Sequence, residues 1–237
     1  MAQNTNFPNL NSSKVAPVWG TAHALADEGT YYIATNPTPS VGIPTTTSVI
    51  DGNNAGAGSA QTRPLMVVYN SNSPVSGLNI YPLYLNMCFT ALPSVGSIWQ
   101  MAMWVDPIGA SVYTSGGSII TPVAANPLIS TASRAQIYFG ALTTAPTTTG
   151  ARLVMRRGVT SILPILSDVH LLSFGDFTQQ VPNVQGTATV ARTIVVPCAP
   201  MVVPPGYALK IGGWMTGNAA APAWEFEFGY AERGAGQ

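Results

Sequence analysis

Few side chains in this 237-residue chain are suited to acid–base or metal chemistry, and the best candidates lie around one histidine. The sequence contains two histidines, His23 and His170, and His170 follows Asp168 by two positions. Residues two apart in a strand project from the same face, so an Asp-His pair is geometrically feasible here. Asp176 follows a turn and is able to approach the pair. No further ligand spacing accompanies these residues, so we favour a hydrogen-bonded polar pair at a strand start.

A second pair of acidic residues lies in the segment AWEFEFGYAER, residues 223–233. Alternation along a strand places Glu225 and Glu227 on one face. The other face carries four aromatic side chains: Trp224, Phe226, Phe228 and Tyr230. Each aromatic ring buries about 150–250 Å², so this stripe predicts a core-facing strand. The glutamates are candidates for an acid pair or a cation site, but a solvated or subunit-facing surface is the interpretation that we favour.

Two further motifs suggest anion or partner binding. The stretch GNNAGAGSA (52–60) resembles a phosphate-binding loop, but no Lys-Ser or Lys-Thr follows it and no helix is expected to supply amide donors, so we interpret it as a turn. The cluster RLVMRRG contains Arg152, Arg156 and Arg157, which are suited to an acidic partner surface or a phosphate. A solvated strand end explains this cluster at least as well.

The chain lacks the common catalytic motifs: G-x-S-x-G, H-E-x-x-H, the P-loop and C-x-x-C. We therefore assign no catalytic, cofactor-binding or metal-binding residue, and we expect a protein that is not an enzyme and uses no cofactor. The two cysteines, Cys88 and Cys198, are interpreted as small buried side chains. The sequence leaves open whether they pair.

The charge content is low and balanced. Charged residues make up 8% of the chain, with nine basic and nine acidic residues, against about 25% in ordinary globular proteins. A nucleic-acid-binding protein usually has a basic excess, so we expect no nucleic-acid partner. Surface charge normally keeps a soluble monomer from associating, so part of this surface is expected to face other subunits. A surface made soluble by Thr, Ser, Asn and Gln is the alternative.

Targeting and membrane segments are not expected. The first residues, MAQNTNFPNL, lack the basic and apolar regions of a secretory signal. Prolines and glycines interrupt every apolar run, so none is long enough for a transmembrane helix. We therefore expect no membrane partner.

Residues 1–62 are rich in Pro and Gly, which disfavour regular structure. A short strand at 29–35 and a helical turn at 22–29 are the expected exceptions. We predict an extended N-terminal arm that becomes ordered on a neighbouring subunit, rather than a disordered tail. This preference rests on its apolar anchors: Phe7, Leu10, Val18, Trp19, Tyr31 and Tyr32.

Residues 63–237 predict an all-β domain, an antiparallel jelly-roll sandwich. Short apolar or alternating segments are separated by turn residues at fairly regular spacing. The expected strands cover 64–70, 77–89, 97–105, 134–142, 151–157, 160–166, 169–174, 187–196, 206–215 and 223–233. The turn Pro204-Pro205-Gly206 is predicted to set the register of the last two strands.

The order of segments over residues 64–233 resembles tailed-bacteriophage virion structural proteins of the jelly-roll or TNF-like trimeric type. The motifs that carry this resemblance are PLMVVYN (64–70), IWQMAMWVDP (98–107), VAANPLISTASRAQIYFGALTTA (123–145), IVVPCAPMVVPPGYALKI (194–211) and GYAER (229–233). The resemblance implies a homotrimeric capsid decoration, or cement, protein that binds the major capsid protein across capsomer junctions. It implies a location on the outer surface of the virion head, after assembly in the host cytoplasm, and no active residue.

A receptor-binding or tail-fibre head that recognises a host-surface glycan is the alternative function. Trp104 and Trp214 are the candidates for stacking on sugars, although packing in the core explains both residues better.

Overall fold

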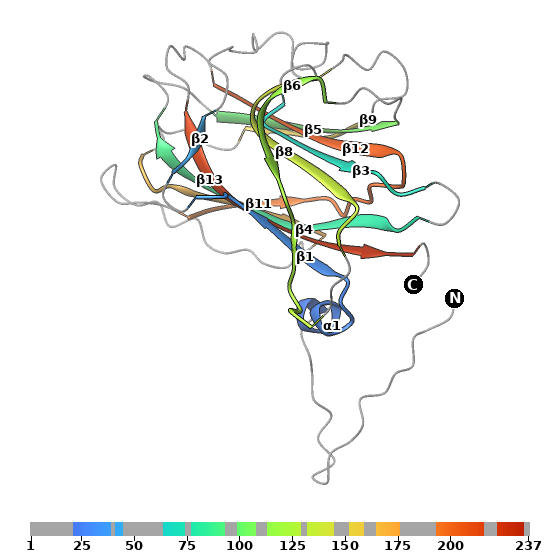
Figure 1. The fold of residues 1–237 in the computed structure, drawn as a ribbon. Coiled ribbons are helices and arrows are strands. Elements are labelled where there is room, and N and C mark those ends of the chain that lie inside the picture. Colours follow the sequence, from blue (N-terminus) through green and yellow to red (C-terminus); the bar gives the residue numbers. More distant parts are fainter. Residues whose placement is uncertain are drawn as a thin grey trace.

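The computed structural model describes residues 21–38, 41–44, 64–73, 77–92, 99–107, 113–128, 132–144, 152–158, 165–175, 193–215 and 222–234. Within these residues, a seven-stranded sheet and a six-stranded sheet pack face to face as a β-sandwich (Figure 1). The all-β, jelly-roll-like sandwich predicted from the sequence is confirmed. No helix in the described part of the chain is long and apolar enough to cross a membrane.

The elements follow one another along the chain in the order α1 (Thr21–Asp27), β1 (Tyr31–Thr35), β2 (Ile43–Pro44), β3 (Met66–Asn70), β4 (Asn79–Ala91), β5 (Trp99–Pro107), β6 (Ser115–Ile120), β7 (Val123–Ala124), β8 (Ala135–Thr143), β9 (Arg152–Gly158), β10 (Val169–Phe174), β11 (Thr193–Cys198), β12 (Tyr207–Met215) and β13 (Ala223–Arg233).

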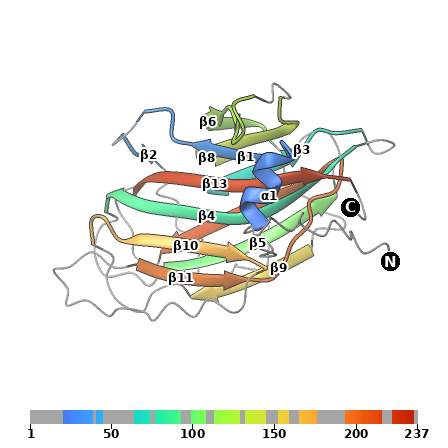
Figure 2. The same ribbon diagram turned by 90° about the horizontal axis from the view of Figure 1, so that it is seen from below.

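The first sheet, called sheet A, has the strand order β11-β10-β4-β13-β1-β7, and β2 also pairs with β13 (Figure 2). The second sheet, sheet B, has the order β6-β8-β3-β12-β5-β9. The pairings are antiparallel except that β10 and β11 run parallel. That pair departs from the purely antiparallel prediction. It is possible because a long connection separates the two strands, as parallel neighbours require.

The core lies between the sheets and is built around β13. Its aromatic stripe is buried as predicted, and Phe226 of sheet A stacks on Phe139 of sheet B with ring centroids 4.1 Å apart. Strand alternation explains this arrangement, because it turns every second side chain of β13 toward the opposite sheet. Burial of large aromatic rings is the main stabilising term of such an interface.

The predicted boundary between an arm (1–62) and a β domain (63–237) is wrong. The strand expected at 29–35 and the helical turn expected at 22–29 are both present, as β1 and α1. However, β1 pairs with β13 along its whole length, and Tyr32 and Ala34 lie in the core. Alternating apolar side chains made this segment a sandwich strand despite the prolines that follow it. The predicted anchor Tyr31 is buried as well. The anchors Phe7, Leu10, Val18 and Trp19 lie outside the described residues, as does the 52–60 stretch.

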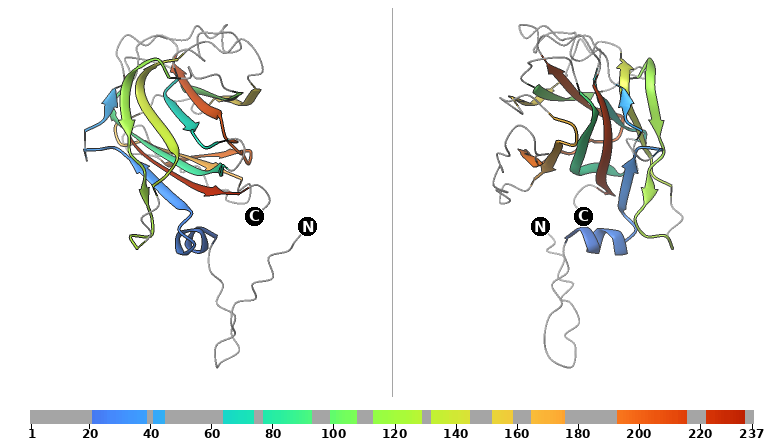
Figure 3. Two further views of the ribbon diagram at one scale, coloured as in Figure 1. Left: turned by 45° about the vertical axis from the view of Figure 1, so that its right-hand side comes forward. Right: turned by 90° about the vertical axis from the view of Figure 1, so that its left-hand side faces the viewer.

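Two local predictions also need correction. The segment expected as a strand at 160–166 is described from Ile165, where the chain forms a turn that contains Ser167 at φ 68°. Strand β6 was not predicted, because it contains Gly116 and Gly117, which are typical of a turn. The short strand β7 was not predicted either. Both glycines have positive φ and lie at an irregularity in the pairing of β6 with β8. Figure 3 shows β6 beside β8 at one side of the sandwich.

The Pro204-Pro205-Gly206 turn precedes β12, as predicted. The Tyr207 N–H donates to the Pro204 carbonyl (3.0 Å), and the Gly206 N–H donates to the Asn70 carbonyl (2.9 Å). Gly206 adopts φ 79°, which favours glycine. The turn therefore fixes the entry of β12 beside β3. It does not set the register of the last two strands, because β12 lies in sheet B and β13 in sheet A.

Candidate functional site

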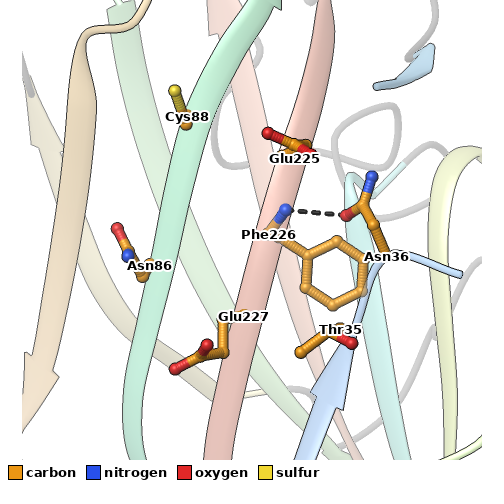
Figure 4. A pocket seen from close by; sticks show the side chains of 7 residues that line it. All are labelled: Thr35, Asn36, Asn86, Cys88, Glu225, Phe226 and Glu227. Carbon is orange, nitrogen blue, oxygen red and sulfur yellow. Dashed lines mark hydrogen bonds between the residues drawn. The ribbon is translucent and has the colours of Figure 1, made fainter. Parts of the chain in front are cut away.

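A groove of about 310 Å³ lies on the outward face of sheet A (Figure 4). We call it the acidic groove. Its lining comes from three strands and the residue after β1: Thr35, Asn36, Asn86, Cys88, Glu225, Phe226 and Glu227. Because Trp224 and Phe226 turn their side chains into the core, alternation along β13 directs Glu225 and Glu227 outward. The prediction that the two carboxylates share a face opposite the aromatic stripe is therefore confirmed.

The register between β13 and β4 supplies the second wall of the acidic groove. Glu225 lies opposite Cys88, and Glu227 lies opposite Asn86. Side chains directly opposite in an antiparallel pair are close neighbours, so each carboxylate has a polar β4 residue beside it. Reasoning from sequence missed these β4 residues, because alternation shows which side chains share a face but does not show which strands pair.

Asn36 forms the third wall by bonding to the β13 backbone. The Phe226 N–H donates to the Asn36 Oδ1 atom (2.7 Å), and Nδ2 of Asn36 donates to the carbonyls of Trp224 (3.2 Å) and Val41 (3.1 Å). The side chain thereby extends the pairing of β13 beyond the end of β1. These contacts make Asn36 a structural part of the acidic groove.

Tyr84 of β4 fixes the carboxylate of Glu227. Its hydroxyl donates a hydrogen bond to Oε1 of Glu227. Burial raises the pKa of Tyr84 far above the usual value of a phenol, and the hydrogen bonds to Glu227 and Tyr31 raise it further. Tyr84 therefore keeps its proton and acts as a neutral donor. Its ring occupies the space beside Gly229, where a Cβ atom would lie 2.2 Å from Cε1 of Tyr84.

The thiol in the acidic groove is not activated for nucleophilic chemistry. Burial raises the pKa of Cys88, and the carboxylates of Glu225 and Asp168 raise it further. The thiolate is the reactive form of cysteine, so this environment keeps Cys88 protonated and weakly reactive. Cys88 and Cys198 are not joined by a disulfide. With two carboxylates and neutral polar neighbours, the acidic groove is suited to binding a cationic group.

The predicted Asp-His candidates are both buried. Oδ2 of Asp168 accepts a hydrogen bond from the Ile165 N–H (2.9 Å) and so closes the turn before β10. The His170 ring packs edge-on against Phe89 and Trp224, with centroids 5.4 Å and 5.9 Å away. Neither side chain is accessible to a dissolved substrate. Asp176 lies outside the described residues. Among the residues that the structure describes, no group of three or more His, Cys, Asp or Glu side chains is placed to hold a metal ion.

The arginine cluster forms β9, an edge strand of sheet B that pairs with β5. Arg152 is exposed, whereas the side chains of Arg156 and Arg157 lie outside the described part. Trp104 is 2% exposed, so the interpretation that it packs inside the protein is confirmed. The side chain of Trp214 lies outside the described residues. The structure therefore does not offer Trp104 as a surface for a sugar ring.

Three buried charged residues were not predicted as such. Nζ of Lys210 lies 2.6 Å from Oδ2 of Asp106, and both side chains are buried. Glu232 is also buried, and its carboxylate accepts hydrogen bonds from the segment before β8. Alternation in the sequence placed Lys210 on the face opposite Leu209 and Ile211. Nothing in the pattern indicated that this outward face would also be covered.

No family model matches the chain, and no curated protein or solved structure is significantly similar to it.

Proposed function

We propose that the chain is a non-enzymatic structural protein of a tailed-bacteriophage virion, most specifically a homotrimeric decoration protein on the outer surface of the capsid. It binds the major capsid protein across capsomer junctions and stabilises the head by burying surface. The β-sandwich and the low charge content support this role, because permanent interfaces are depleted in charged residues.

The observation that carries the proposal is a set of exposed apolar side chains, which we call the β6–β7 edge. Its members are Ile119, Val123 and Leu128, which are 69%, 66% and 91% exposed. Among the described residues, strands β6 and β7 end sheets B and A respectively, so edge backbone groups of two sheets lie beside these side chains. Several exposed apolar side chains along one edge segment are typical of a protein contact surface.

The charged residues add to this argument, because several of them do not contribute to the surface. Lys210 and Asp106 are buried together, and Glu232 is buried against backbone donors. Arg233 and Glu28 pair with each other at 3.1 Å. The exposed surface of the described residues is therefore even poorer in free charge than the composition alone indicates. Such a surface is suited to permanent association with other subunits.

Cosedimentation of the purified protein with capsids that lack it tests the proposal. We expect saturable binding and a higher melting temperature of the decorated capsid. The variant Ile119→Ser/Val123→Ser/Leu128→Ser should bind capsids about tenfold more weakly, because it removes the apolar contacts. Val41→Ser, at another exposed apolar position, is the matched control and should bind as the wild type does.

Two results would contradict the proposal. One is failure of the wild-type protein to bind capsids. The other is binding to glycans on an array without binding to capsids, which would support the receptor-binding alternative instead.

Deletion of residues 1–20, the part of the predicted arm that precedes α1, is a separate test. It should weaken capsid attachment and leave the homotrimer intact.

A further inference from the structure

We propose that Lys210 and Asp106 condense into an amide bond that joins strands β12 and β5 of one chain. The structure describes the two residues as a buried ion pair, which is the state from which the bond forms. The inference goes beyond the proposed function and does not depend on it. Three features support it: the contact distance, the rigid pairing of the two strands and the exclusion of water.

The reacting groups are already in contact. Nζ of Lys210 lies 2.6 Å from Oδ2 of Asp106. Because Cγ of Asp106 is bonded to Oδ2, the nitrogen lies about 3–4 Å from the carbon that it must attack, which is the range of a near-attack geometry. Holding two groups in this way is equivalent to an effective concentration of about 10⁵–10⁸ M. A condensation that is negligibly slow between dissolved amines and carboxylic acids therefore becomes feasible within the lifetime of the protein.

The pairing of β12 with β5 keeps the two side chains together. The strands pair over nine consecutive positions without a register shift. Lys210 lies opposite Trp104 and Asp106 lies opposite Ala208, so both reacting side chains project from the outward face of sheet B. Both strands are inner strands of that sheet, because β3 lies beside β12 and β9 lies beside β5. Neighbours on both sides restrict local opening, so the two groups stay in contact.

The site is closed to bulk water. The side chain of Lys210 is 0% exposed and that of Asp106 is 1% exposed. Their cross-strand neighbours are buried and apolar: Trp104, Val67 and Ala208. Apolar surroundings penalise both charges, so moving a proton from Nζ to the carboxylate costs less here than in water. This transfer produces the neutral amine and the carboxylic acid that react with each other.

The bond forms with the loss of one water molecule. After the proton transfer, the lone pair of Nζ attacks Cγ of Asp106 and gives a tetrahedral intermediate. The intermediate expels the carboxyl hydroxyl together with one proton of the amine as water, and the new C–N bond remains. The two residues supply every atom and proton of this step. Exclusion of water from the site then opposes hydrolysis of the amide.

Intact-mass spectrometry of the full chain tests the inference. Wild-type protein that is kept folded at neutral pH for several days should become lighter by the mass of one water molecule. Proteolysis should then release a branched peptide that joins the segment around Lys210 to the segment around Asp106. Chains with the bond should also unfold at a higher urea concentration than chains that still hold the ion pair, because the bond closes a long loop in the unfolded state.

Two variants serve as controls. Lys210→Arg keeps a cation beside Asp106, but a guanidinium stays protonated and is not a nucleophile, so this variant should keep its full mass. Lys210→Met/Asp106→Leu lacks both reacting groups and should also keep its full mass. If either variant fails to fold, as thermal melting will show, wild-type protein held unfolded in urea replaces it, because unfolding separates the two groups.

Three results would overturn the inference. The first is a folded wild-type chain that keeps its full mass throughout the incubation. The second is a loss of water that maps to another carboxylate, such as Asp51 before Gly52. The third is an equal loss of water in the unfolded protein, since the fold would then not be its cause. None of these results bears on capsid binding, which cosedimentation tests separately.

Discussion

Lys210 of β12 and Asp106 of β5 form a 2.6 Å ion pair that is fully buried, although it projects from the outward face of sheet B. Lys210 lies directly opposite Trp104, and Asp106 lies two residues further along β5, so the contact is diagonal across the two strands. Removing one member leaves the other charge buried without this partner.

We therefore expect Lys210→Met alone to lower the free energy of unfolding by about 3–5 kcal/mol. Lys210→Met combined with Asp106→Leu should cost far less, because no charge is then left buried. Urea unfolding measures both effects. Arg233→Met removes the partly exposed pair with Glu28 and, as the control, should cost less than about 1 kcal/mol. If Lys210→Met lowers the free energy of unfolding by less than about 1 kcal/mol, the buried pair does not stabilise the fold.

Glu232 links the two sheets through backbone donors. Its Oε1 atom accepts hydrogen bonds from the Ser133 hydroxyl (2.5 Å), the Arg134 N–H (3.0 Å) and the Ala135 N–H (3.2 Å). Glu232→Gln keeps the shape but replaces one acceptor oxygen with a donor, so it should lower the free energy of unfolding by about 1.5–3 kcal/mol. Glu28→Gln is the exposed control. Equal costs for the two variants would argue against a special role for Glu232.

Gly229 provides the space that Tyr84 occupies beside the acidic groove. A Cβ atom at this position would lie 2.2 Å from Cε1 of Tyr84 and 2.8 Å from the hydroxyl of Tyr31. Gly229→Ala should therefore cost about 1–3 kcal/mol of stability through overpacking. In a double-mutant cycle, Gly229→Ala should cost less in a Tyr84→Leu background, where the ring is absent. A cost that does not depend on Tyr84 would place the strain elsewhere.

Tyr230 should make the protein less stable in alkaline solution. Burial raises the pKa of its hydroxyl far above the usual value, the hydrogen bond with Ser133 opposes this, and the Glu232 carboxylate adds to it. Tyrosine in an unfolded chain ionises near pH 10. Above that pH the folded state binds more protons than the unfolded state, so the free energy of unfolding falls as pH rises.

The variant Tyr230→Phe isolates this effect. It should reduce the alkaline decline by up to about 1.4 kcal/mol per pH unit above about pH 10. Phe226→Leu changes a buried aromatic side chain that has no hydroxyl, so it should lower stability by the same amount at pH 7 and in alkali. An alkaline decline of wild-type slope in Tyr230→Phe would contradict the assignment.

The position of β1 makes a prediction about truncation. β1 pairs with both β13 and β7, and it contributes Tyr32 and Ala34 to the core. Deletion of residues 1–20 removes none of the described elements and should leave thermal unfolding cooperative. Deletion of residues 1–44 also removes β1 and β2, exposes the edge of β13 and should abolish cooperative unfolding. Unchanged unfolding after the longer deletion would restore the idea of a separate arm up to residue 62.

Much of the fold could be predicted because strand alternation is a local property. The segment 223–233 shows this best, since its aromatic side chains and its glutamates lie on opposite faces as the pattern requires. β6 could not be predicted in the same way, because Gly116 and Gly117 follow no apolar alternation. The pairing of strands was also out of reach, since it depends on contacts between segments far apart in the chain.

The candidate site was likewise predicted only in part. The shared outward face of Glu225 and Glu227 follows from spacing alone. The groove around them does not, because Asn86, Cys88 and Asn36 reach it through the pairing of β13 with β4 and β1. Burial of the Lys210–Asp106 pair could not be predicted either, because alternation gives a face and not what covers that face.

A cryo-electron-microscopy map of virions of the tailed phage that encodes this chain tests the central claim most directly. The account predicts trimers of this β-sandwich on the outer head surface, above capsomer junctions, with the β6–β7 edge against the major capsid protein. Density for the sandwich only at a tail tip, or a particle that lacks the chain altogether, would contradict it.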